Sequence, residues 1–155
     1  MITHDMVSEQ WELDYPKPRD VARNLENLPE ITLTLENKYN KYWDFYYKVQ
    51  YQLNQLNTKL TSLENILKLY YTKKPISERL KEKYNLEPLQ IAYTKQEIDS
   101  VIKADERYCE LIGEIKVTES LLKRIEGCIK FITSWGFNQK EFAQMHRINS
   151  GYLKE

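Results

Sequence analysis

The sequence predicts an all-α fold, built on a long antiparallel helical hairpin of coiled-coil type with a short C-terminal helix and an extended N-terminal arm. Four glycines and five prolines among 155 residues are too few turn residues for a sandwich or barrel of short strands. Apolar residues recur three and four positions apart over two long segments, which is the period of an α-helix that faces a partner. A chain of this length builds one modest domain, or shares one core between subunits.

Residues 1–30 are predicted to form the N-terminal arm. Three prolines leave only short apolar stretches between them: Pro16, Pro18 and Pro29. Each proline fixes its own φ, lacks a backbone donor and disfavours the α region for the residue before it. We therefore expect an extended arm in which His4 lies in a disordered start and at most one or two helical turns form around 20–28.

The strongest pattern in the chain predicts a first long helix over about 30–72. Eleven apolar residues follow one another at alternating spacings of four and three: Leu35, Tyr39, Tyr42, Tyr46, Val49, Leu53, Leu56, Leu60, Leu63, Leu67 and Tyr70. A 4-3 repeat kept over five heptads is typical of a coiled coil or a long helical hairpin. Pro75 predicts the end of this helix just beyond Tyr71.

The same helix carries a second apolar stripe, which we call the aromatic ridge and which consists of Trp43, Tyr47 and Tyr51. One apolar stripe is enough to pack a helix in a hairpin, so a second stripe needs a second partner. We expect that partner to be another copy of the chain. The alternative is that the N-terminal arm and the short C-terminal helix cover the ridge within one chain.

A basic connector over 72–93 is expected to join the two long helices of the hairpin, which spans 31–137. Within the connector, the stretch from Ser77 to Tyr84 suits a short helix. The second long helix is predicted to start at Thr94, because Thr94 and Glu97 have the spacing of a capping box, in which each side chain satisfies a free backbone donor. Its apolar residues again recur three and four positions apart.

The second long helix is predicted to end at Trp135-Gly136-Phe137, where the glycine suits the left-handed residue that follows many helices. A short C-terminal helix is then expected over 138–155, capped by Asn138 and Glu141. Because a short helix is unstable alone, we expect it to serve oligomerisation together with the aromatic ridge. The oligomerisation residues predicted at this end of the chain are Phe137, Phe142, Met145 and Ile148.

No enzyme activity, metal site or cofactor is predicted. Two cysteines cannot form a disulfide framework, no cysteine or histidine pair has zinc spacing, and the glycines are too far apart for a P-loop. His146 has no catalytic partner nearby. Asp105 interrupts the apolar stripe of the second long helix. Its carboxylate needs a cation or a hydrogen-bond donor, most simply in a structural salt bridge across the hairpin or between subunits. Without a signal peptide or a membrane-spanning run, a cytoplasmic protein is expected.

The net charge is zero, from 23 basic and 23 acidic residues, which excludes an overtly basic nucleic-acid-binding tail. Charge is nevertheless uneven along the chain, because 68–95 carries seven basic and three acidic residues. The basic residues alternate with tyrosines: Lys68, Lys73, Lys74, Arg79, Lys81, Lys83 and Lys95 with Tyr70, Tyr71, Tyr84 and Tyr93. Lysines that neutralise phosphates beside rings that stack on unpaired bases suit single-stranded nucleic acid. The alternative is solvated charge at a helix connection, with Tyr70 and Tyr71 packed inside.

Several motifs, in order and at matching spacing, resemble the UvsY recombination mediators of T-even-like bacteriophages. They are Trp11-Glu12-Leu13-Asp14 ahead of a tyrosine-rich helix, Tyr70-Tyr71-Thr72, the stretch 95–106, and Ile129-Lys130-Phe131-Ile132 leading to Gly136-Phe137 and Lys140. The resemblance implies an all-helical protein that assembles into a ring, typically a heptamer, and that binds single-stranded DNA without catalysing a reaction. Its implied partners are a single-strand-binding protein, whose grip it weakens, and a UvsX-type recombinase, whose filament it helps to nucleate in the cytoplasm of the infected bacterial host.

The chain departs from this family at three places. Members often carry a Lys-x-Arg pair before the double tyrosine, and the matching positions here are Asn65 and Leu67. Trp135 replaces an arginine and Ile148 a late phenylalanine, which points to a rebuilt DNA or assembly contact. The DNA-binding residues predicted instead are Lys59, Lys68, Lys73, Lys74, Arg79, Lys81, Lys83, Tyr70, Tyr71 and Tyr84. The competing hypothesis is a structural coiled-coil oligomeric adaptor that does not bind DNA.

Overall fold

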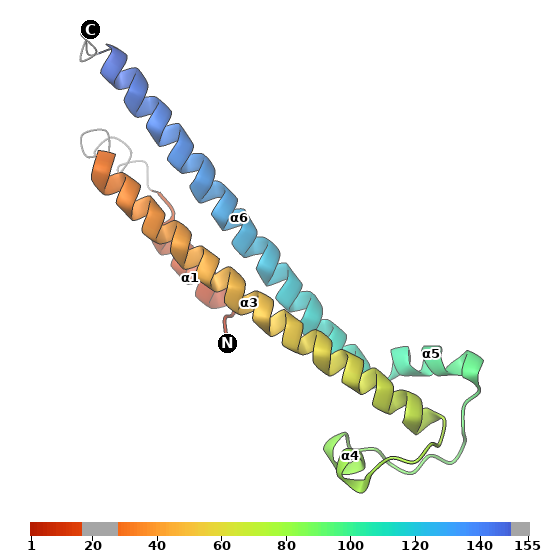
Figure 1. Ribbon diagram of the computed structural model, residues 1–155. Helices are drawn as coiled ribbons and strands as arrows, with labels where there is room; N and C mark the ends of the chain where they lie inside the picture. Colours follow the sequence, from red (N-terminus) through yellow and green to blue (C-terminus); the bar gives the residue numbers. More distant parts are fainter. Residues whose placement is uncertain (17–27, 150–155) are drawn as a thin grey trace. The chain divides into compact units, whose positions relative to one another are not determined.

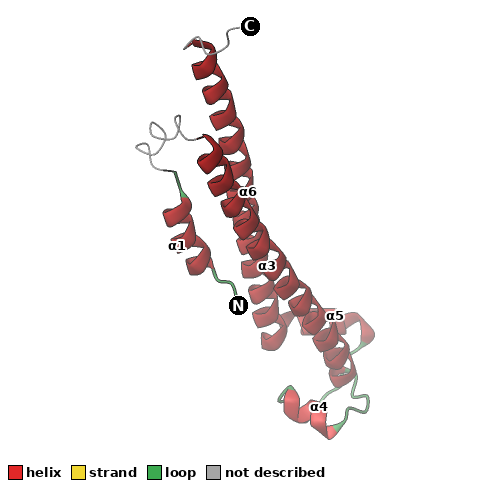
Figure 2. Ribbon diagram, turned by 60° about the vertical axis from the view of Figure 1, so that its left-hand side comes forward, coloured by secondary structure: helices red, strands yellow, loops and turns green. Residues whose placement is uncertain are grey.

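The computed structural model describes residues 1–16 and 28–149, and every regular element in this part of the chain is an α-helix (Figures 1 and 2). The helices are α1 (His4–Asp14), α3 (Leu28–Tyr71), α4 (Glu78–Lys83), α5 (Lys95–Ala104) and α6 (Glu106–Asn149). The predicted all-α class is thus confirmed. Among the described residues, no helix is both long and apolar enough to cross a membrane.

The chain divides into two compact units. Unit 1 comprises residues 1–51 and 120–155, and unit 2 comprises residues 52–119. The two 44-residue helices α3 and α6 contribute to both units. Unit 1 also contains α1, whereas unit 2 contains α4, α5 and the loops around them.

The core of unit 1 forms where α3 packs against α6. Tyr42 and Val49 of α3 are fully buried against five residues on one face of α6: Leu121, Ile125, Cys128, Ile129 and Ile132. Farther along, a Cβ atom on Gly136 would lie 3.6 Å from Cδ1 of Leu35. Residue 35 thus lies near residue 136, and α3 and α6 pack along one another within this unit.

Helix α1 corrects the prediction of an extended N-terminal arm. The Thr3 hydroxyl accepts a hydrogen bond from the Met6 N–H at 3.3 Å and so caps the helix. Val7 is fully buried in the core of unit 1, and burying a valine side chain contributes about 1.5 kcal/mol or more. His4 therefore begins a helix rather than lying in a disordered start. The helical turns expected around 20–28 fall almost entirely outside the described residues.

The end of α1 is held by charge as well as by apolar contacts. The Asp14 carboxylate, with only 9% of its side chain exposed, accepts hydrogen bonds from Lys41 and Tyr42 at 3.3 Å each. Trp11 packs edge-on against Tyr42 and Phe131, with ring centroids 5.6 and 5.4 Å apart. A partly buried aspartate with a cationic partner and a hydroxyl donor fixes α1 in register on α3.

The core of unit 2 joins the end of α3 to the connector and to α5. Leu63 and Leu67 of α3 pack with Leu86 of the connector and with Ile98 and Ile102 of α5. The short helix expected from Ser77 to Tyr84 forms as α4, over Glu78–Lys83.

The start of α5 confirms the predicted helix start at Thr94. The Glu97 carboxylate accepts hydrogen bonds from the Thr94 N–H at 3.0 Å and from its hydroxyl at 2.7 Å. These bonds hold the pKa of Glu97 below its usual value.

The second long helix is interrupted at Asp105, where the sequence predicts continuous helix. Asp105 has extended backbone angles, φ −67° and ψ 129°, between the end of α5 and the start of α6. Its carboxylate accepts the Arg107 N–H at 3.0 Å, which is the hydrogen bond of an aspartate at a helix N-cap. The residue that breaks the apolar stripe therefore also begins a new helix.

Helix α6 then continues through Gly136 to Asn149, so the predicted stop and the separate C-terminal helix are wrong. Gly136 does not adopt the left-handed backbone of a helix C-cap. Phe137 is 63% exposed. A glycine inside a helix costs about 1 kcal/mol relative to alanine, and buried neighbours on both sides, Ile132 and Gln139, keep the helix packed through it.

We predict that Gly136→Ala raises the free energy of unfolding by about 0.5–1 kcal/mol, because alanine loses less backbone entropy in a helix. The added methyl group makes an ordinary van der Waals contact with Leu35. Gly127→Ala is the matched control, since nothing lies within 4 Å of its Cβ position and it lies inside the helix under either interpretation. Urea unfolding measures the free energy of unfolding of both variants. A higher value for Gly127→Ala together with a lower value for Gly136→Ala would contradict a continuous α6.

Candidate nucleic-acid interface

The basic connector leaves α3 through a hydrogen-bonded helix end that contains no glycine. The Lys73 N–H donates to the Tyr70 carbonyl at 3.0 Å, and the Lys74 N–H donates to the Leu69 carbonyl at 2.9 Å. This is the pattern of a Schellman motif. Lys73 occupies its left-handed position with φ 52°, where glycine is usual because a Cβ atom costs about 1–2 kcal/mol. The chain thus keeps a lysine at a strained position.

The short helix α4 ends in the same way. The Asn85 N–H donates to the Glu82 carbonyl at 3.2 Å, and the Leu86 N–H donates to the Lys81 carbonyl at 2.9 Å. Asn85 takes the left-handed conformation with φ 49°, which asparagine tolerates better than most residues. Two tight helix ends therefore set the path of the connector.

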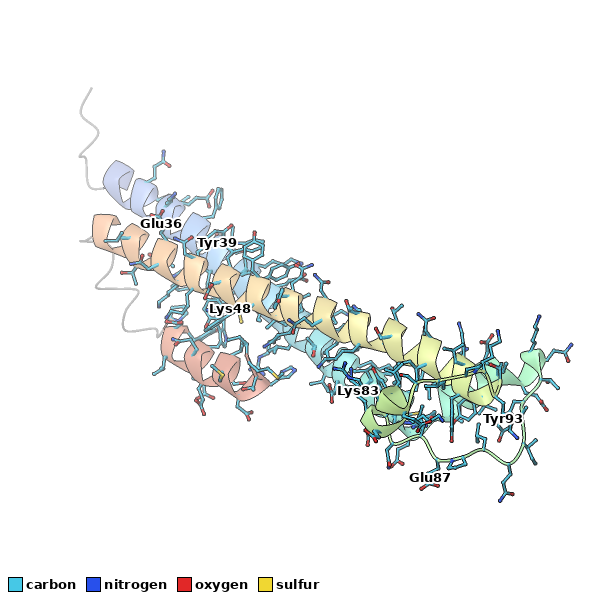
Figure 3. All side chains as sticks on the ribbon, turned by 60° about the horizontal axis from the view of Figure 1, so that its bottom comes forward. Glu36, Tyr39, Lys48, Lys83, Glu87 and Tyr93 are labelled. Carbon is cyan, nitrogen blue, oxygen red and sulfur yellow. The ribbon has the colours of Figure 1, made fainter. Side chains whose placement is uncertain are left out.

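The predicted basic residues of unit 2 are mostly exposed. Within the described part of the chain, six of them have no ion pair: Lys59, Lys68, Lys73, Lys74, Arg79 and Lys83. Lys73 donates to the Gln90 carbonyl at 2.9 Å, which leaves its charge uncompensated. Lys83 lies 5.1 Å from the ring centre of Tyr84, and Figure 3 labels it on α4. Lys81 alone pairs with a carboxylate, that of Glu78 at 2.7 Å.

The three tyrosines predicted to bind DNA are partly buried and hold the connector in place. Tyr70, Tyr71 and Tyr84 all pack against the core of unit 2. The Tyr70 hydroxyl donates to the Glu87 carbonyl at 2.6 Å, and the Tyr71 hydroxyl donates to the Asp105 carboxylate at 2.7 Å. These contacts match the alternative in which Tyr70 and Tyr71 are packed inside. Stacking on DNA bases stays a prediction for all three.

Asp105 and Arg107 form a bidentate ion pair in the centre of unit 2. The guanidinium donates from Nε at 2.9 Å and from Nη2 at 2.6 Å, and the Asp105 side chain is only 3% exposed. Arg107 Nη1 also donates to the Tyr84 carbonyl at 2.7 Å. The predicted salt bridge of Asp105 is therefore present, but its cation is two residues away, and the contact with α3 is made by Tyr71.

The surroundings of this pair shift two pKa values. Burial by itself raises the pKa of the Asp105 carboxyl, but hydrogen bonds from Arg107 and Tyr71 outweigh it and hold the pKa below its usual value. Burial and the bond to Asp105 raise the pKa of Tyr71 to about 12. Both shifts favour the ionised aspartate and the neutral tyrosine, which is the pairing that the fold uses.

The connector also encloses a cleft of about 180 Å³. The residues that line it are mainly apolar and basic: Tyr70, Lys73, Lys74, Ile76, Lys81, Leu86, Glu87, Pro88 and Leu89. Figure 3 labels Glu87 on the loop that follows α4 and Tyr93 on the loop that precedes α5. Tyr93 is 38% exposed and lies edge-on to Tyr71. The cleft was not evident in the sequence, because its walls come from residues up to 19 positions apart.

The predicted oligomerisation residues all fall in unit 1, whereas the predicted DNA-binding residues all fall in unit 2. Tyr47, Tyr51, Phe137 and Met145 are each more than 60% exposed. Trp43 is partly buried and stacks on Tyr47 with ring centroids 5.6 Å apart. The side chains of Phe142 and Ile148 lie outside the described ones. Among the described residues, Tyr47 and Tyr51 of the aromatic ridge are left exposed, whereas Trp43 packs partly against the core.

Among the described residues, no group of three or more histidine, cysteine, aspartate or glutamate side chains could hold a metal ion. The most strongly hydrogen-bonded carboxylate, Asp105, is saturated by Arg107 and Tyr71. The basic connector of unit 2 carries positive charge beside the cleft described above. Positive charge of this kind suits binding of a polyanion.

We predict that Asp105→Asn lowers the free energy of unfolding by about 2–3 kcal/mol at pH 7, since it leaves Arg107 without its partner. The depressed pKa of Asp105 contributes stability that is present above the unfolded-state pKa of about 3.9 and is lost as pH falls through the lower folded-state value. The difference between wild type and variant should therefore shrink in acid. Urea unfolding from pH 2 to 7 checks this, with exposed Asp99→Asn as the control. A pH-independent difference would contradict it.

Comparison with known proteins bears on the family of the chain. The family model described as "Recombination, repair and ssDNA binding protein UvsY" matches residues 17–152, which include both long helices and the basic connector but not α1. No curated protein and no solved structure gives a match. The match covers most of the chain, including the basic connector, and it confirms the resemblance that the motifs predict. The chain belongs to the UvsY family of recombination, repair and single-stranded-DNA-binding proteins.

Proposed function

We propose that the protein is an oligomeric recombination mediator, which binds single-stranded DNA through unit 2 and helps to load a UvsX-type recombinase onto strands covered by single-strand-binding protein. It would act in homologous recombination, repair and recombination-dependent replication. The observation that carries this proposal is the excess of positive charge around the connector: residues 68–95 have seven basic and three acidic residues, and only Lys81 of the predicted contacts is ion-paired.

The strength of this charge suits a protein that passes DNA on. Each phosphate neutralised by a lysine adds a salt-sensitive increment of affinity. About four contacts per protomer give binding that is weak for one subunit and strong for several subunits on one strand. A mediator needs such binding, because a strand held too firmly could not be transferred to a recombinase. Because the net charge of the whole chain is zero, its long-range, non-specific attraction to duplex DNA is weak.

Assembly is proposed to use unit 1. Its aromatic ridge exposes Tyr47 and Tyr51, each at 64%, and the exposed Phe137 and Met145 lie on α6 of the same unit. Large aromatic side chains are enriched at protein interfaces and rarely left in water in such number. A second copy of the chain, and a heptameric ring by resemblance, would cover them.

A structural adaptor without DNA binding is the second candidate. The observation in its favour is that Tyr70 and Tyr71 use their hydroxyl groups for contacts inside unit 2, which leaves less aromatic surface for bases. In an adaptor the lysines of the connector would only be solvated charge. The following experiment separates the two candidates.

We predict that a triple variant, Lys68→Gln, Lys73→Gly and Lys74→Gln, binds single-stranded oligonucleotides more weakly and reduces the slope of log affinity against log salt by about 2. Glycine at 73 relieves the left-handed strain, which offsets the lost bond to Gln90, so the variant should remain folded. A matched triple variant loses three exposed lysines elsewhere, none of them in an ion pair with a described residue: Lys103, Lys116 and Lys123. Fluorescence anisotropy over a salt series measures both.

The connector variant should also fail to stimulate recombinase filament formation on strands covered by single-strand-binding protein, while its native mass stays unchanged. Equal loss of affinity in the two triple variants would show diffuse charge rather than a site at the connector. Wild-type protein that binds no oligonucleotide at any salt concentration would favour the adaptor.

We further predict that Tyr47→Gln with Tyr51→Gln lowers the native mass of the particle, because polar side chains remove the apolar surface that a second copy would bury. Both side chains are largely exposed, so the fold of unit 1 should persist. Ile91→Gln, at a side chain that is 72% exposed in unit 2, is the control. Sedimentation velocity measures the mass, and an unchanged oligomer in the double variant would refute an interface at the aromatic ridge.

A further inference from the structure

We infer that the cleft of the connector receives one unpaired base of the bound strand, while the lysines at its rim contact the phosphates on either side. This inference rests on the proposed function and adds to it a specific subsite. The cleft lies wholly within unit 2, so its walls are set by the contacts of that unit alone.

The shape of the cleft suits a flat apolar ring. Leu86, only 9% exposed, and Ile76 belong to the core of unit 2, whereas Pro88 and Leu89 come from the loop after α4. The ring of Tyr70 also lines the cleft, with its hydroxyl fixed on the Glu87 carbonyl. The apolar part of the lining is therefore held by the packed core.

The size of the cleft limits what it can hold. A volume of about 180 Å³ is more than ten times the ~10–15 Å³ that one ordered water requires. It is also below the ~300 Å³ at which pockets for drug-sized ligands begin. A single aromatic ring system is of the right scale, whereas a complete nucleotide with its phosphates is too large and must leave the phosphates outside.

The charges around the cleft agree with this orientation. Lys73, Lys74 and Lys81 line it together with Glu87. Lys73 is held at its backbone by the Schellman motif and at its ammonium group by the Gln90 carbonyl, so one cation has a fixed place. Phosphates favour the lysines and are repelled by the Glu87 carboxylate. A base edge, which carries both donors and acceptors, can satisfy both kinds of side chain.

Such a subsite would distinguish single strands from duplex DNA. In a duplex the base faces are stacked and paired, and extruding one costs a few kcal/mol. In a single strand the face is free, and its burial against apolar and aromatic side chains adds affinity that depends little on sequence. Phosphate contacts alone would not make this distinction, because both forms carry phosphates.

The test compares an oligo-dT strand with an abasic deoxyribose-phosphate strand of the same length, by fluorescence anisotropy over a salt series. Wild-type protein should bind the dT strand at least about fivefold more tightly. Leu89→Ser should reduce this ratio towards one while leaving the salt slope unchanged, since no phosphate contact is removed. Leu89 lines the cleft without belonging to the core cluster, so the fold should persist, and circular dichroism of the variant checks this.

Ile91→Ser is the matched control, because Ile91 lies on the same connector, is 72% exposed and does not line the cleft. Ile91→Ser should keep the wild-type ratio of affinity for the dT strand to affinity for the abasic strand. Leu89→Phe provides a second test, as it fills the cleft without removing apolar surface, and should also lower the ratio. A wild-type ratio near one with a normal salt slope would overturn the base subsite yet leave single-strand binding intact. Absence of binding to either strand would overturn the proposed function itself.

Discussion

The arrangement of unit 2 depends on one buried carboxylate. Asp105 ends α5, caps α6 through the Arg107 N–H, pairs with the Arg107 guanidinium and accepts the Tyr71 hydroxyl. Arg107 in turn donates to the Tyr84 carbonyl at the end of α4. A buried aspartate is costly unless its oxygens are satisfied, so these bonds form together or not at all. The connector that carries the lysines is thereby tied to both long helices of this unit.

Features with a local physical cause could be predicted from the sequence. The 4-3 repeat predicts α3 almost to its last residue, because one apolar stripe must face a partner along its whole length. Thr94 and Glu97 predict the start of α5, since the capping box involves only neighbouring residues. The motif resemblance was sufficient for the family, and the charge of 68–95 located a basic surface that the net charge of the chain conceals.

The errors arise where tertiary packing overrides a local signal. Gly136 has the sequence of a helix end, but packing in unit 1 carries α6 through it. The three prolines of residues 1–30 suggested an extended arm, yet burial of Val7 and packing of Trp11 stabilise a helix of 11 residues. Arg107 gave no signal, because its role depends on a helix break at Asp105 that periodicity cannot show. The roles of Tyr70 and Tyr71 were open for the same reason. A tyrosine that packs in the core and a tyrosine that stacks on a DNA base can occupy the same positions of the helical repeat.

The division between the two units gives this small chain room for two kinds of surface. Exposed aromatic residues are concentrated in unit 1, and uncompensated lysines are concentrated in unit 2. Apolar association favours a surface with little charge, because each buried ion must be desolvated. Phosphate binding instead favours a surface that is rich in basic side chains. Placing both on one surface would weaken each. Under the proposed function, the assembly residues belong to unit 1 and the DNA-binding residues to unit 2. The zero net charge of the chain conceals the basic excess of 68–95, which the acidic residues of 96–119 balance within unit 2.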